Sequence, residues 1–433
     1  EEGATNSRAD QRRQGAPLAR AAVRTFVRAP GAVVASKQAR RSSRDAVRAE
    51  MDRPFEPFAV EQFMSENEQR VELVFAESGV HPMSAKELLE GDDTKRDTIL
   101  DTLLDYPEVN GLVALRRRIA ALYGCDDPDH VLVTVGASEA NYVLAQCLVR
   151  REGDVVAVLA PTYKQFAGDA KNNGANVREF YLSTENGWKL DMDSLKAAVT
   201  PDTKVVALVN PNNPTGHVLD EDERAAIIEA ARAVGAWLLV DEVYAGAETT
   251  GDAETPSFYG SYEKVVCVNS MSKAYGLPGL RIGWAIGPKA LIQQAWRHHE
   301  YATISGSMLG NHLALHALSP EVRPRLTSRA RGLIRRGWPI LQEVVEENSD
   351  LLSVTFPGAS AMCFVRYKLK IGSRALALRL IEEQKMLVVP GEAFAQEHHL
   401  RFTYALPEER VREGLRRLVE TLRAVEQEER ALV

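Results

Sequence analysis

The segment from Ser270 to Gly283 combines residue types that suit a reactive amine beside a bound phosphate. It reads SMSKAYGLPGLRIG and contains Ser270, Ser272, Lys273 and Arg281. A lysine among small residues can lose its hydration and become nucleophilic. Serine hydroxyls and a guanidinium fork are donors that bind a phosphate monoester. The segment therefore predicts covalent chemistry at Lys273 next to a phosphate site.

Two more polar motifs follow apolar runs earlier in the chain. The loop NPNNPTG at 210–216 contains two prolines and a glycine, which fix the direction of Asn213. The motif DEVY at 241–244 contains Asp241 and Tyr244 and ends another apolar run. A carboxylate at such a place is costly unless it meets a cation or a donor. A protonated pyridine nitrogen would be such a partner.

Two further motifs offer an anion site and an aromatic face. The turn GASEA at 136–140 brings Ala137 and Ser138 to the start of an expected helix, where free amides bind anions. The motif PTY at 161–163 presents Tyr163, whose ring can lie against another ring. Each motif alone also fits an ordinary loop or strand end. Together they supply a lysine, an acid, an amide, an aromatic ring and a phosphate cradle, a set that no ordinary core needs.

The elements that must position these motifs alternate between strand and helix signals. Apolar runs predict strands at 131–136, 155–160, 205–210, 236–241, 264–269 and 280–287. Helices are expected at 138–151, with Ser138 as N-cap, and at 220–234, where acids occupy the first turn. This alternation is typical of a mainly parallel, doubly wound α/β sheet. Each motif follows a strand, and ligands bind beyond the carboxyl ends of such strands.

After residue 305 the pattern changes. A long helix is expected over 308–348, strands at 360–367 and 399–405, and helices at 373–385 and 407–429. In the last helix, Val411, Leu415, Leu418 and Leu422 recur at spacings of three and four, which gives one apolar face. We therefore expect a second, smaller α+β unit after the large sheet.

Composition narrows the class of protein. The 433 residues carry 53 Lys and Arg against 60 Asp and Glu, a net charge of −7, which argues against general nucleic-acid binding. No apolar stretch is long enough to span a bilayer. The histidine pairs 298–299 and 398–399 lack a third ligand at a fixed spacing, so no metal site is expected.

Residues 1–50 differ from the rest of the chain. They hold eleven Lys and Arg against five Asp and Glu, with Arg20, Arg24 and Arg28 on one helix face. This pattern is typical of an organelle transit peptide. A disordered basic arm or an expression remnant fits it as well. We expect a soluble protein that is cytoplasmic, or mitochondrial or plastidial where the leader acts as a transit peptide.

These motifs, in this order, make residues 54–430 resemble the class I/II aminotransferases, which are pyridoxal-5′-phosphate (PLP) enzymes of fold type I. The segment 270–283 matches the family's lysine signature, and NPNNPTG and DEVY stand where the family has them. The resemblance implies a mainly parallel seven-stranded sheet in a large domain, with a smaller α+β domain built from both chain ends. It places the N-terminal arm and part of the small domain at 51–105, the large domain at 106–307, and the interdomain helix and small domain at 308–433.

The resemblance also implies a role for each matching residue. Lys273 would form a Schiff base with PLP and move the substrate proton, Asp241 would pair with the pyridine nitrogen, and Tyr163 would stack on the ring. Asn213 and Tyr244 would donate to the phenolic oxygen. The phosphate would be held by Ala137, Ser138, Ser270, Ser272 and Arg281. In LRFTYA, Arg401 would grip the substrate α-carboxylate beside Asn213, although it also fits a surface strand. Tyr106, in YPEVNG, would reach the cofactor of a neighbouring subunit, which implies a homodimer with shared sites.

One segment departs from the common pattern of the family. Residues 75–84 read FAESGVHPMS instead of a Gly-Glu-Pro-like turn and weakly resemble capreomycidine synthase-like enzymes, which eliminate and cyclise. Glu77 or His81 could contact a polar or basic substrate side chain, or the segment could simply pack on the cofactor domain. Three functions therefore stay open: an aminotransferase acting on an amino acid and a 2-oxo acid, a lyase or cyclase on the same scaffold, and a non-catalytic regulator.

Overall fold

The computed structural model describes residues 55–432, and the predicted basic leader at 1–50 lies outside them. Residues 56–432 lie in one compact unit. Within the described residues, no helix has both the length and the apolarity that a membrane span requires. The domain boundaries expected after residues 105 and 307 stay predictions.

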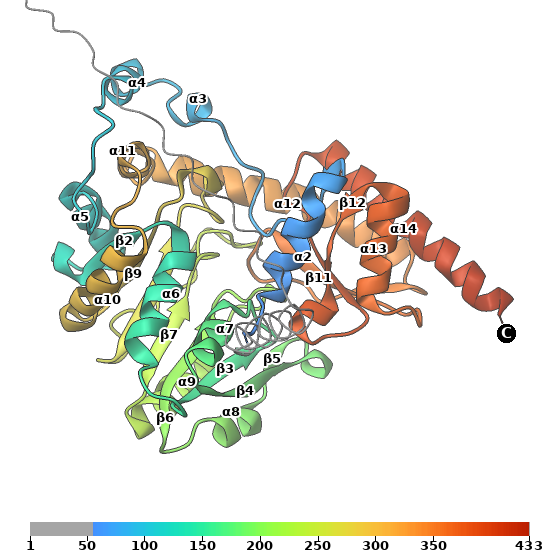
Figure 1. Ribbon diagram of the computed structural model, residues 1–433. Helices are drawn as coiled ribbons and strands as arrows, with labels where there is room; N and C mark the ends of the chain where they lie inside the picture. Colours follow the sequence, from blue (N-terminus) through green and yellow to red (C-terminus); the bar gives the residue numbers. More distant parts are fainter. Residues whose placement is uncertain (1–54, 433) are drawn as a thin grey trace, which may run out of the picture. The chain divides into compact units, whose positions relative to one another are not determined.

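A large twisted sheet forms the centre of this unit (Figure 1). Its strand order is β2-β9-β8-β7-β6-β3-β4-β5, and the five central strands from β8 to β4 are parallel. The strands are β2 Val131–Thr134, β3 Val155–Ala160, β4 Asn176–Ser183, β5 Lys189–Leu190, β6 Thr203–Val209, β7 Trp237–Asp241, β8 Val265–Ser270 and β9 Gly283–Ile286. The α/β class is confirmed, but the sheet has eight strands and not seven. The two-residue β5, antiparallel to β4, is too short to show a periodicity.

Helices cover both faces of this sheet, as its apolar strands require. Side chains of β3 alternate between two separate cores: Val156 and Val158 pack with α6, α7 and α10, while Ala157 and Leu159 belong to the core that includes α5, α8 and α9. These helices are α5 Val113–Leu122, α6 Gly136–Leu148, α7 Gln165–Asn172, α8 Met192–Ala198, α9 Glu221–Val234 and α10 Lys289–Ala302. Burial on both faces explains why the strands read as continuous apolar runs.

The starts of two helices follow from local chemistry. Helix α9 begins with a capping box, in which Asp220 accepts from the Glu223 amide and the Glu223 carboxylate accepts from the Asp220 amide. Helix α6 begins at Gly136, two residues before the expected cap. The Glu139 side chain accepts a 2.6 Å hydrogen bond from the Val135 amide, so Ser138 is not needed as a cap and lies in the first turn.

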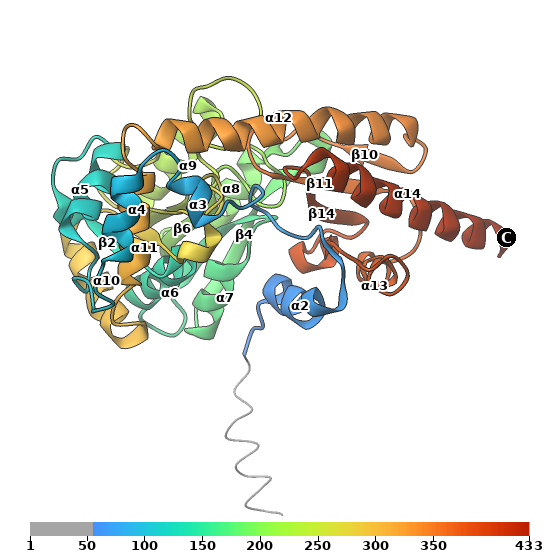
Figure 2. The same cartoon turned by 90° about the horizontal axis from the view of Figure 1, so that it is seen from above.

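The smaller part of the fold combines the C-terminal elements with a segment from near the N-terminus (Figure 2). A four-stranded sheet has the order β10-β11-β14-β13, and β1 pairs in parallel with β12. The elements of this part are α2 Ala59–Asn67, β1 Leu73–Val74, β10 Leu352–Val354, β11 Met362–Tyr367, α13 Ser373–Gln384, β12 Met386–Leu387, β13 Val389–Pro390, β14 His399–Thr403 and α14 Glu408–Ala431. The long helix α12 Arg323–Glu347 packs on α14 and β10. Helix α11 Met308–Ala317 instead packs on α5 and on α4 Asp93–Leu100, which follows the short α3 Ala85–Leu88. The single helix expected at 308–348 is wrong, because the chain breaks around Pro320 between α11 and α12.

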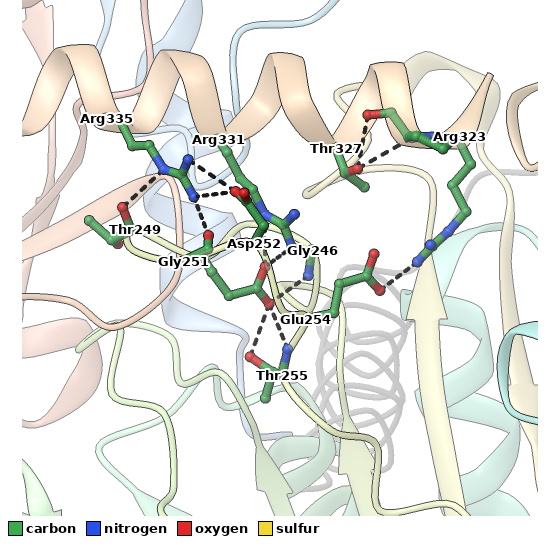
Figure 3. Close-up of polar contacts among 12 residues, drawn as sticks. Gly246, Thr249, Gly251, Asp252, Glu254, Thr255, Arg323, Thr327, Arg331 and Arg335 are labelled. Carbon is green, nitrogen blue, oxygen red and sulfur yellow. Dashed lines mark hydrogen bonds and ion pairs between the residues drawn. The ribbon is translucent and has the colours of Figure 1, made fainter. Parts of the chain in front are cut away.

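Helix α12 is tied to the loop that follows the DEVY motif. Figure 3 shows its arginines directed at residues 246–255: Arg323 pairs with Glu254 at 2.6 Å, and Arg335 contacts Asp252 at 3.3 Å. Arg331 forms a buried ion pair with Glu248, whose other oxygen accepts from the Gly246 and Thr255 amides. These contacts fix the position of the loop that follows β7 and the DEVY motif.

Candidate active site

A cavity of about 320 Å³ lies at the carboxyl ends of β6, β7 and β8, where ligands bind in such sheets. Ten of the twelve residues to which the family resemblance gives a role line it: Ala137, Ser138, Tyr163, Asn213, Asp241, Tyr244, Ser270, Ser272, Lys273 and Arg281. They come from five separate segments of the chain. The structure therefore brings the separate motifs together in one place.

Lys273 lies three residues after the end of β8 and is half-buried. Burial lowers the pKa of its amine, while the charge of Glu77 acts in the opposite direction. The segment around Glu77 packs directly on the lysine loop, because a Cβ added to Gly79 would lie 3.1 Å from the carbonyl oxygen of Ser272. The amine is thus held in a partly desolvated place, which favours its neutral, nucleophilic form.

An anion cradle occupies the side of the cavity next to helix α6. Gly136 has a φ of +77°, and a Cβ there would come within 2.5 Å of Arg281 Nη2, so the glycine lets the guanidinium lie against the first turn of α6. The first amides of a helix have no partner within it. Ser270 and Ser272 line the same cavity. Free amides, hydroxyls and a guanidinium together form the donor set that a phosphate monoester requires.

Asp241 is buried at the end of β7. Its Oδ2 accepts from Asn141 Nδ2 at 2.9 Å, and its Oδ1 accepts from the Val243 amide at 3.2 Å. Burial raises the pKa of its carboxyl to about 6, and these hydrogen bonds only partly offset the shift. A buried carboxyl of this kind is stabilised by a cation in the cavity. Asn141 was missed in the sequence, although it follows Ala137 by one helical turn on α6.

A second guanidinium lies next to the cavity on β14. Arg401 is only 1% exposed, donates from Nη2 to the Ala76 carbonyl at 2.7 Å, and donates from Nη1 to Asn213 Oδ1 at 3.2 Å. Asn213 in turn donates to Tyr244 Oη at 3.1 Å, which fixes both polar groups on the cavity wall. Arg401 Nε has no partner, and no carboxylate of residues 55–432 pairs with this cation. The surface-strand interpretation of Arg401 is therefore wrong.

The N-terminal segment supplies wall residues that sequence reasoning did not assign. Helix α2 brings Glu61 to the cavity, where Glu61 Oε1 accepts from Tyr163 Oη at 2.7 Å. Ser78 of the same segment also lines it, as does Gln165 at the start of α7. Glu77 lines the cavity, whereas His81 is not among the lining residues. The His81 amide donates to the Ala405 carbonyl at 2.9 Å.

Tyr106 lies apart from this cavity. It is 75% exposed in the single chain and follows three exposed leucines, Leu100, Leu103 and Leu104. The His299 ring connects this region to helix α6: its Nε2 lies 3.0 Å from the Val109 carbonyl and its Nδ1 lies 2.8 Å from Glu139 Oε1. The expected role of Tyr106 at a neighbouring subunit stays a prediction.

Comparison with known proteins gives one consistent result. The family "Aminotransferase class I and II" matches residues 90–418. The chain is 32% identical to capreomycidine synthase of Streptomyces vinaceus over 84% of this chain and 93% of that protein. It is also 32% identical to aspartate aminotransferase of Streptomyces avermitilis, over 73% and 81%. The crystal structure of a PLP-dependent aminotransferase from Streptococcus suis superposes with a TM-score of 0.80 at 29% identity, over 86% and 99% of the two chains.

The fold and these likenesses define an enzyme of fold type I that depends on PLP. The chain belongs to the class I and II aminotransferase family.

Proposed function

We propose that this enzyme is an aminotransferase that moves an amino group between an amino acid and a 2-oxo acid. The observation that carries the proposal is one cavity containing a half-buried lysine, a buried carboxyl and a phosphate cradle. Beside it lies a buried arginine that has no anionic partner within residues 55–432. PLP with an α-amino acid would provide a partner for each of them: a carbonyl carbon for the lysine, a pyridine nitrogen for the carboxyl, a phosphate for the cradle and an α-carboxylate for the arginine. The family and its relatives support the same class of chemistry.

The residues present fit PLP. Arg281, the first turn of α6, Ser270 and Ser272 would hold its phosphate, because they provide the donors described above. Asp241, kept in place by Asn141, would pair with the pyridine nitrogen, and Tyr163 would lie against the ring. When bound, PLP supplies a carbonyl carbon that takes up the amino group and a ring that withdraws electrons from the substrate Cα.

Two residues would act on the amino acid directly. Arg401 would bind the α-carboxylate through its free Nε and an Nη, since a buried guanidinium without a carboxylate is costly. Lys273 Nζ would bind the cofactor covalently, and once released it would take a proton from the substrate Cα and deliver it to the former carbonyl carbon of PLP. The lowered pKa of Lys273 suits this task, because a base must lose its own proton near neutral pH.

We propose that the enzyme acts as a homodimer. Leu100, Leu103, Leu104 and Tyr106 form an exposed apolar stretch, and Tyr301 at the end of α10 is 93% exposed. The hydrogen bond between His299 and Val109 joins these two regions of the chain. A second copy would cover the apolar side chains, and Tyr106 would then reach the phosphate of its partner's cofactor.

A lyase or cyclase is the second candidate. The observation that favours it is the segment 75–84, which packs on the lysine loop, together with the likeness to a capreomycidine synthase along 93% of that protein. The compartment, whether cytoplasm or organelle, depends on the basic leader and stays a prediction.

The two functions differ in the fate of the α-nitrogen. We would incubate the holoenzyme with α-¹⁵N amino acids and with pyruvate or 2-oxoglutarate, then measure ¹⁵N in the products by mass spectrometry. An aminotransferase moves ¹⁵N to the acceptor and leaves a 2-oxo acid behind. Consumption of the amino acid with ¹⁵N retained in a ring, or released as ammonia, contradicts the proposal and supports the second candidate. The Lys273→Ala variant is the control for non-enzymatic transfer.

A further inference from the structure

Two carboxylates line the cavity without a cationic partner. Glu61 reaches it from α2 and Glu77 from the segment after β1. Neither forms an ion pair with any lysine, arginine or histidine of residues 55–432. Among the residues that the structure describes, the only side-chain hydrogen bond at Glu61 comes from Tyr163 and uses Oε1, while Oε2 has no partner.

Both carboxylates lie on the side of the cavity where the substrate is expected. Glu77 directly follows Ala76, whose carbonyl accepts from Arg401 at 2.7 Å. Two residues further along, Gly79 lies against the backbone of Lys273. Burial lowers the pKa values of Lys273 and Arg401, and the charges of Glu77 and Glu61 raise both of them. The two carboxylates therefore act on the amine and the guanidinium that would handle the amino acid.

When the charged groups around the cavity are paired with those of the ligand, Glu61 and Glu77 remain without a positive partner. In the proposed function, Arg281 is balanced by the cofactor phosphate, Asp241 by the pyridine nitrogen and Arg401 by the substrate α-carboxylate. Nothing in that arrangement neutralises Glu61 or Glu77. The unpartnered, buried Arg401 independently indicates that the ligand carries an anion as well, so the two observations together describe a molecule with an α-carboxylate and a distal positive charge.

We propose that Glu61 and Glu77 form a subsite for a cationic side chain, so that the preferred amino acid ends in a guanidinium or a primary amine. This proposal rests on the proposed function only in assigning the α-carboxylate to Arg401. A guanidinium suits the subsite well, because its five donors can serve two carboxylates at once. A side-chain carboxylate, as in aspartate, would be repelled by both glutamates.

The test compares ligands that differ in charge but not in shape. We would titrate the holoenzyme with arginine, with its uncharged isostere citrulline and with aspartate, and follow the cofactor absorbance to obtain apparent dissociation constants. Since each charge-assisted hydrogen bond contributes about tenfold in affinity, arginine should bind at least about tenfold more tightly than citrulline. Aspartate should bind more weakly than both. Equal affinities for arginine and citrulline would overturn the proposal.

Variants assign the preference to the two glutamates. Glu61→Gln keeps an acceptor for Tyr163, and Glu77→Gln keeps the size of the side chain. In the double variant the ratio of citrulline to arginine dissociation constants should fall to about one, with citrulline binding unchanged. Glu66→Gln, on the same helix α2 but outside the cavity lining, should keep the wild-type ratio. An unchanged ratio in the double variant would overturn the assignment.

A second measurement needs no variant. Because the preference is electrostatic and the carboxylates are open to solvent, the arginine-to-citrulline ratio of the wild-type enzyme should fall as salt is raised. A ratio independent of salt would contradict the subsite. These measurements report binding, so they are distinct from the nitrogen-transfer assay. An arginine preference without nitrogen transfer refutes only the aminotransferase proposal, and nitrogen transfer without that preference refutes only the subsite.

Discussion

Replacement of Arg401 tests how the substrate is held. The guanidinium is 1% exposed and uses two donors on Ala76 and Asn213, so Nε and further Nη protons remain for a carboxylate. Two charge-assisted hydrogen bonds at about 1.5 kcal/mol each give about 3 kcal/mol. Arg401→Ala should therefore raise KM by about 150-fold. Arg401→Lys keeps the charge but loses the fork, so its KM should rise by about tenfold.

The assay must separate the α-carboxylate from the side chain. We would measure KM for cationic, neutral and acidic amino acids with each variant, and check by circular dichroism that the fold is retained. Because every amino acid has an α-carboxylate, all KM values should rise by a similar factor. If only one class of substrate is affected, Arg401 reads side chains and the reasoning is refuted. The glutamate variants of the cationic subsite should show the opposite pattern and affect only cationic substrates.

Three further outcomes follow from other contacts. Leu103→Glu should dissociate the proposed dimer, as sedimentation velocity would show, because it places a charge in the exposed apolar stretch. His299→Leu should lower the free energy of unfolding by about 2 kcal/mol in urea titrations, because it removes one hydrogen bond from the buried Glu139 carboxylate, which keeps those from the Val135 amide and Thr303. Burial alone would raise the pKa of Glu223, but hydrogen bonds from His217 and two amides lower it to about 2. Glu223 therefore stabilises the fold above about pH 4.5, and this contribution is lost as the pH falls towards 2 and is absent in Glu223→Gln.

Two of these outcomes have a matched control variant. His298→Gln, at the less buried neighbour of His299, should leave the unfolding free energy within about 0.5 kcal/mol of the wild type. Leu432→Glu, at an exposed leucine beyond the end of α14, should not change the sedimentation coefficient. A dimer that survives Leu103→Glu would contradict the proposed interface. An unfolding free energy unchanged in His299→Leu would contradict the contact with Glu139. An unfolding free energy that falls below about pH 4.5 by the same amount in Glu223→Gln and in the wild type would contradict the contribution of Glu223.

Much of the site could be predicted from the sequence because its motifs directly follow strands. The carboxyl ends of parallel strands meet at one edge of a sheet, so Asn213, Asp241 and Lys273 had to lie near one another once the strands were identified. The glycine-containing turn at 136–138 could be placed in the same way. The role expected at each position then came from the resemblance to the family.

Other features depend on tertiary packing and leave no local pattern. Glu61 lines the cavity only because α2 lies against Tyr163, more than a hundred positions away in the sequence. Asn141 becomes part of the site through its hydrogen bond to Asp241, which lies one hundred residues further along the chain. The break between α11 and α12 did have a local signal in Pro320, which outweighs the helical composition on either side.

The most direct test of the account is where the cofactor is attached. We would load the full chain with PLP, reduce it with borohydride to fix the bond between cofactor and lysine, and map the labelled peptide by mass spectrometry. We expect a single label on Lys273, and no label in Lys273→Ala, whose fold should be retained. A label on any other lysine of the wild-type chain would contradict the assignment of the active site.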